Sequence, residues 1–155
     1  MSEAPSEEKL IEIAARLLAE AAFVFVEPSQ AGLGKVESMR VARVAIEGSE
    51  AWQLIFAVDT NLGRELAANL LGLDESTEEA GKSSADAVGE MANILAGALA
   101  VEFTQSGPCR IGIPSLSFEP GAKIGAALAT AERKANLVTE NGTHLAVALM
   151  RGGAA

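Results

Sequence analysis

The sequence has few of the residues that form most metal and cofactor sites. It contains one cysteine (Cys109), one histidine (His144), one tryptophan and no tyrosine among 155 residues. A single cysteine allows no internal disulfide, and protein metal sites usually combine several Cys, His or carboxylate ligands at characteristic spacings. No cluster in the sequence has such spacing. We therefore expect no metal and no cofactor of the chain's own.

Basic residues and long apolar runs are also scarce. Lys and Arg total 12 against 21 Asp and Glu, so the formal net charge is −9 at pH 7. Nucleic-acid binding depends on Lys and Arg contacts with phosphates, and this balance argues against it. No apolar run reaches the ~20 residues of a membrane span. Residues 1–8 lack the basic start and apolar run of a secretory signal, so the sequence predicts a cytoplasmic protein that binds no membrane.

Apolar residues, in contrast, are plentiful. They make up 49% of the chain, and because aromatic residues are few, Ala, Val, Leu and Ile have to fill the core. A chain of this length suits a single domain over residues 1–155, with loose tails at 1–5 and 151–155.

Three segments have the apolar spacing of amphipathic helices. The first covers residues 6–22, with Ser6 as its N-cap. The second starts at Asp59 or Thr60 and ends at Gly72. The third runs to about Phe103 after a cap at Ser83, Ser84 or Asp86. The acidic residues 74–82 between the last two are either a linker or the irregular start of the third helix.

Six further segments are typical of strands: 23–28, 39–46, 51–58, 110–118, 128–139 and 143–150. Val41 and Val44 are out of phase in the second, which allows a bulge. Pro114 places the fourth at a sheet edge, Gly121 and Gly125 indicate a loop, and Asn141-Gly142 predicts a tight hairpin turn. The order of elements predicts an α+β fold, with a mainly antiparallel sheet of about six strands and the long helices on one face.

The third helix carries an unusual polar stripe. Asp86, Glu90, Asn93 and Gly97 follow one another at spacings of four, three and four, which places them on one side of a helix. Glu90 and Asn93 are one turn apart and therefore neighbours on its surface. The opposite side is apolar, and the small residues around the stripe shield it little: Gly89, Ala96, Gly97 and Ala100.

This pattern resembles a known signature. Asp-x-x-x-Glu-x-x-Asn on a long helix, followed by a proline (Pro114), is similar to the motif of the CheC/CheX chemotaxis phosphatases, which dephosphorylate the response regulator CheY. One copy of the motif is present, which is closer to CheX than to CheC. The resemblance implies a CheC-like fold, a phosphorylated CheY-like response regulator as partner, and a homodimer.

The resemblance also implies roles for the residues of the stripe. Asn93 would orient the attacking water, and Glu90 would pair with the active-site Lys of the partner. Asp86 would cap the helix or contact the partner. Gly97 lies outside the motif, and its lack of a side chain would let the partner approach closely. The Mg²⁺ that the reaction requires would belong to the regulator.

Two other interpretations remain open. A Glu and an Asn three residues apart also occur on ordinary solvated helices without any function. The chain could then be a non-catalytic CheC-fold module that binds a signalling or flagellar-switch partner. The other alternative to a phosphatase is a sensory domain that binds a small ligand between the sheet and the helices, although no residue pattern identifies a ligand.

Overall fold

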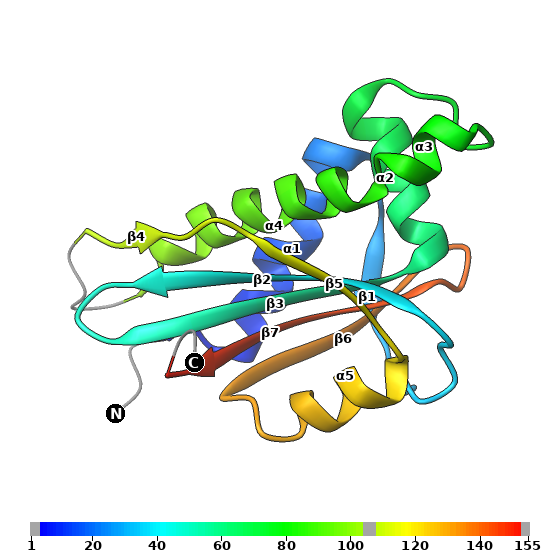
Figure 1. Ribbon diagram of the computed structural model, residues 1–155. Helices are drawn as coiled ribbons and strands as arrows, with labels where there is room; N and C mark the ends of the chain where they lie inside the picture. The colour runs from blue at the N-terminus through cyan, green and yellow to red at the C-terminus, as the bar shows by residue number, and fades with distance from the viewer. Residues whose placement is uncertain (1–3, 104–107, 153–155) are drawn as a thin grey trace.

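A seven-stranded antiparallel sheet forms the centre of the computed structural model, which describes residues 4–103 and 108–152 (Figure 1). Its strands follow the order β1-β6-β7-β3-β2-β4, and β5 also pairs with β2. The strands are β1 (Val26–Pro28), β2 (Met39–Glu47), β3 (Ala51–Asp59), β4 (Arg110–Ile111), β5 (Ser115–Glu119), β6 (Arg133–Thr139) and β7 (His144–Arg151). The α+β fold with an antiparallel sheet is confirmed, with seven strands instead of about six.

The long helices lie on one face of this sheet, as the sequence predicts. They are α1 (Glu7–Ala22), α2 (Thr60–Leu71) and α4 (Ser84–Ala100), and the short α3 (Glu78–Lys82) precedes α4. The side chain of Ser6 accepts a hydrogen bond from the Lys9 amide, and that of Asp59 from the Asn61 amide. Gly72 ends α2 with φ 71°. No helix in the described residues is both long and apolar enough to cross a membrane.

The fifth helix, α5 (Gly121–Leu128), covers the other face, where the sequence indicated only a loop. Ile124 and Leu128 lie four residues apart and are buried in one cluster with β2 residues such as Met39 and Val41. This helix has neither a side-chain N-cap nor charged residues in its terminal turns that would favour it, so the usual signals of a helix are missing. As a result β6 begins at Arg133, and not at position 128.

The sheet is covered on both faces, which also explains why apolar and polar residues do not alternate regularly along β2. Val44 belongs to the core beneath the long helices, and Val41 to the smaller core beneath α5. The ladder with β3 continues without interruption from the Met39–Asp59 pair to the Glu47–Ala51 pair. The bulge that the sequence pattern allows is therefore absent, because strands covered on both sides need not alternate apolar and polar residues.

The first predicted strand is shorter than expected. Only Val26–Pro28 pairs with β6, whereas Phe23 is the C-cap of α1 in the left-handed region, with φ 55°. Its amide donates to the carbonyl of Ala19, which satisfies part of the helix end. Glycine usually occupies this conformation, so a phenylalanine here offers no local signal that the helix ends.

The two predicted tails lie partly outside the described residues, namely at 1–3 and 153–155. The remainder is held by the fold. The carbonyl of Pro5 accepts a hydrogen bond from Arg133 Nε at 2.8 Å, and Arg151 is the last residue of β7.

An ion-pair network joins the edge strand β5 to β2. Arg43 donates through Nη1 to Glu119 Oε2 at 2.5 Å and through Nη2 to Oε1 at 3.3 Å. Ser117 Oγ donates to Oε2 at 2.6 Å, and Lys123 Nζ lies 3.6 Å from Oε1. The hydrogen bonds from Arg43 are the main reason that the pKa of Glu119 falls from 4.5 to about 2, against the opposing effect of burial.

We predict that Glu119→Gln lowers the free energy of unfolding at pH 7 by about 2 kcal/mol, because it weakens charge-assisted hydrogen bonds. The folded-state pKa is depressed, so the carboxylate contributes fully above pH 4.5 and its contribution is lost as the pH falls toward 2. Denaturant unfolding of both proteins across this range would measure it. A difference that stays constant with pH would contradict the role of the charge.

Candidate functional site

One side of α4 is packed into the core and fixes the direction of the other. Its fully buried residues lie against α1, α2, β2 and β3. They are Ala87, Val88, Met91, Ala92, Leu95, Ala96 and Leu99, each with no exposed surface. A rotation of the helix would bring these side chains into water, so the opposite side is held outward.

The structure places the predicted polar stripe on this outward side. Asp86, Glu90 and Gly97 are exposed, and Asn93 is half-buried. Within the described residues, the side chains of Asp86, Glu90 and Asn93 make no hydrogen bond or ion pair. A carboxylate and a carboxamide one turn apart are therefore both available to an approaching molecule.

Asp86 does not cap the helix, which corrects one of its two expected roles. α4 begins at Ser84, and Ser83 at the N-cap position makes no side-chain capping bond. The chain passes almost directly from α3 into α4: the Ser83 amide donates to the Glu79 carbonyl, and Ser84 Oγ donates to the Gly81 carbonyl at 3.0 Å. Asp86 lies within the first turn, where a negative charge interacts favourably with the helix dipole.

The segment that contains β4 and β5, residues 110–119, lies beside this helix (Figure 1). A Cβ atom built at Gly89 would lie 3.5 Å from Leu116 Cδ2 and 3.7 Å from Pro114 Cβ. These are ordinary van der Waals distances, so this segment packs directly against α4 at Gly89. In contrast, a Cβ at Gly97 would have no neighbour within 4 Å, so the helix surface is open there.

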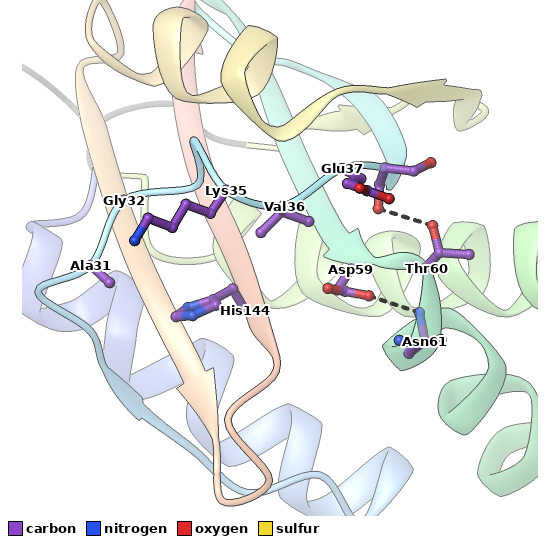
Figure 2. A pocket seen from close by; sticks show the side chains of 10 residues that line it. Ala31, Gly32, Lys35, Val36, Glu37, Asp59, Thr60, Asn61 and His144 are labelled. Carbon is purple, nitrogen blue, oxygen red and sulfur yellow. Dashed lines mark hydrogen bonds between the residues drawn. The ribbon is translucent and has the colours of Figure 1, made fainter.

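A separate cavity of about 450 Å³ lies between the loop before β2 and the start of α2 (Figure 2). Lys35, Asp59, Asn61 and His144 are among the residues that line it, but no residue of the stripe is. Asp59 accepts from the Asn61 amide, and Thr60 Oγ1 donates to the Ser38 carbonyl at 2.9 Å. These polar groups therefore serve the start of α2, and we assign the cavity no function.

Metal-binding geometry is also absent from the described residues, where no three His, Cys, Asp or Glu side chains come together in a suitable arrangement. The sequence does not predict that Leu116 and Pro114 pack against α4 at Gly89. The one indication of this packing in the sequence is the proline that follows the motif. No local pattern relates residue 89 to residue 116, because the two are far apart in the chain.

Comparisons with known proteins point to one family. Residues 40–133, which include the whole stripe and Pro114, match the family model described as chemotaxis phosphatase CheX. A search of curated protein sequences gave no match.

Solved structures of low sequence identity share the fold. A chemotaxis protein CheX from Desulfovibrio desulfuricans is 16% identical, with a TM-score of 0.67 over 94% of this chain and 97% of that one. CheX from Vibrio vulnificus is 15% identical, with a TM-score of 0.67 over 96% and 99%. A CheX-CheY-BeF3-Mg²⁺ complex from Borrelia burgdorferi is 17% identical, with a TM-score of 0.63 over 96% and 99%.

The open surface at Gly97 leads to a stability prediction. Gly97→Ala should raise the free energy of unfolding by about 0.5–1 kcal/mol, because alanine lowers the entropy cost of the helix and its methyl group meets nothing. Chemical denaturation measures the change. A loss of stability would show that the position is more crowded than the structure indicates.

Proposed function

Because the chain belongs to the CheX family of chemotaxis phosphatases, we propose that it accelerates hydrolysis of the aspartyl phosphate of a CheY-like response regulator. The observation that carries this proposal is the stripe on α4, where Glu90 and Asn93 are fixed outward and unpaired among the described residues. The Borrelia burgdorferi protein of similar fold forms a complex with CheY that also contains BeF3 and Mg²⁺. That complex supports a regulator as the partner.

In this proposal Asn93 is the catalytic residue. Hydrolysis needs a water molecule in line with the breaking P–O bond, and catalysis of phosphoryl transfer is largely a matter of position and electrostatics. The carboxamide oxygen can accept a hydrogen bond from that water, while the NH2 group donates to a nearby oxygen. Its backbone is held by a packed helix, so only the rotamers of the side chain remain to be fixed when the partner binds.

Glu90 would bind the partner rather than take part in the reaction. Its carboxylate is exposed and unpaired within the described residues, one turn before Asn93, where it could form an ion pair with the active-site Lys of the regulator. This pair would align Asn93 with the phosphoryl group. Asp86 and Gly97 would contact the partner at the two ends of the stripe. We propose that the regulator supplies the Mg²⁺ and that the chain contributes no metal.

The decisive experiment follows the decay of a phosphorylated CheY-type regulator from the same organism, with and without this protein. We predict that the native protein accelerates the decay and that Asn93→Ala loses about 100-fold or more of this acceleration, since it removes the group that orients the water. Glu90→Ala should weaken both binding and acceleration. Asn61→Ala, at an exposed asparagine on α2, is the matched control and should behave like the native protein.

Two results would contradict the proposal in different ways. Normal acceleration by Asn93→Ala would refute the assigned mechanism. Binding of regulators without any acceleration by the native protein would favour the non-catalytic binding module instead.

We also propose that the chain forms a homodimer. The sheet ends in two edges, at β1 on one side and at the strands that flank β2 on the other. Open edges tend to pair with other strands, and a two-fold dimer is one way to protect them. Light scattering should therefore give a molar mass close to twice the 15.9 kDa of the chain, and a monomer mass at micromolar concentration would contradict the proposal.

A further inference from the structure

Large apolar side chains gather at the surface of the segment 110–119, which contains β4 and β5. Ile113 is 92% exposed, Phe118 54% and Leu116 40%. The other exposed large apolar residues of the described chain are Phe23, Phe25, Leu71 and Val101, and none of them lies in this segment. Three such side chains within six residues form an apolar surface, and its exposure to water is unfavourable.

Two of these side chains lie on the same face of the sheet as α4. Leu116 pairs with Ala42, and Phe118 pairs with Arg40. Directly paired residues of antiparallel strands project from the same face, and Ala42 is buried in the core beneath the long helices. Leu116 and Phe118 therefore project on the helix-bearing side, at the edge of the sheet next to α4.

This apolar surface adjoins the polar stripe. Leu116 Cδ2 would lie 3.5 Å from a Cβ atom at Gly89. On a helix, Asp86 and Asn93 are three and four residues away from Gly89 and are its surface neighbours. Since Gly89 has no side chain, nothing on α4 separates Leu116 from the stripe at this level.

Phe118 is held in place by a cation. The Arg40 guanidinium carbon lies 3.6 Å from the centre of its ring, a geometry in which the cation is attracted to the aromatic face. Arg40 itself lies close to the starts of α2 and α4, because a Cβ atom at Gly63 would meet Arg40, Ser84 and Val88 within 4 Å. An exposed aromatic ring that is fixed in this way loses little entropy when a partner covers it.

Ile113 directly precedes Pro114, whose Cβ atom would lie 3.7 Å from a Cβ atom at Gly89. We infer that Ile113, Leu116 and Phe118 form the apolar half of the docking surface for the phosphorylated regulator, beside Glu90 and Asn93; the inference rests on the proposed function. The two halves are continuous across Gly89, so a protein that docks on the stripe also covers the segment 110–119. The two halves would contribute to binding in different ways. The acidic stripe attracts the regulator's Lys, and the apolar half adds buried contact area that needs no charged partner. A second copy of this chain that docked through the stripe would bring two acidic stripes together, which the repulsion of like charges opposes.

The test measures binding separately from catalysis. The probe is a CheY-type regulator carrying beryllofluoride and Mg²⁺, titrated with the native protein and with Phe118→Ala. We expect Kd to rise about tenfold or more, as for truncation of an interface aromatic. Phe25→Ala is the matched control, because Phe25 is 56% exposed and precedes β1 at the opposite edge of the sheet. This variant should bind the regulator with the same Kd as the native protein.

A second variant guards against loss of folding. Phe118→Ala removes a ring that stacks on Arg40 and can change local structure, whereas Ile113 is almost fully exposed. Ile113→Ser should therefore leave the unfolding midpoint unchanged and still raise Kd severalfold. In dephosphorylation assays both variants should raise KM more than they lower kcat, the reverse of Asn93→Ala.

The outcomes separate this inference from the proposed function. If the native protein accelerates decay but Phe118→Ala and Ile113→Ser bind like the native protein, the inference is wrong and the proposed function stands. An equal rise in Kd for Phe25→Ala would also refute it. If Phe118→Ala and Ile113→Ser change the oligomeric mass and leave Kd unchanged, a second copy covers the segment and the inference is again wrong. If the native protein neither binds nor dephosphorylates any regulator, both proposals fail.

Discussion

The burial of one side of α4 is the constraint on which the geometry of the candidate site depends. Met91, Leu95 and Leu99 are fully buried against the sheet and the neighbouring helices. Each step along an α-helix turns the chain by about 100°, so these three side chains fix the angular position of every other residue. Glu90 and Asn93 consequently face outward whether or not a partner is present. Such preorganisation reduces the entropy lost when a complex forms, and it suits a reaction that depends on placing a water molecule.

Small residues lie where other elements pack against α4. A Cβ atom at Gly63 on α2 would lie 3.4 Å from Ser84 Cβ, and one at Gly89 would lie 3.5 Å from Leu116. These are ordinary contact distances, so α2 and the segment 110–119 both pack against the motif helix, from two sides. The Ala-rich and Gly-rich sequence of α4 therefore allows a low, accessible surface around the stripe, because little side-chain bulk stands between neighbouring elements.

The parts of the fold and of the site that could be predicted from the sequence are those with local signals. Ser6, Asp59 and Gly72 mark helix ends by their own chemistry, and the spacing along α4 places the stripe on one side of the helix. α5 was missed because its buried residues, Ile124 and Leu128, are meaningful only once the second face of the sheet is known to need cover. The proximity of Gly89 to β5 likewise depends on how β5 pairs with β2, through contacts between residues far apart in the sequence. No periodicity within either segment could reveal it.

The position of Glu90 on α4 bears on which partners the site could accept. Asp86 lies in the first turn, where the positive end of the helix offsets part of its charge. Glu90 lies beyond that turn and has no ion-pair partner among the described residues. It is exposed to water in the free protein, and docking would remove part of that water at a considerable free-energy cost unless the partner places a cation there. The same carboxylate that would attract the regulator's lysine would therefore oppose any protein without one, so specificity in this proposal comes from a penalty as much as from an attraction.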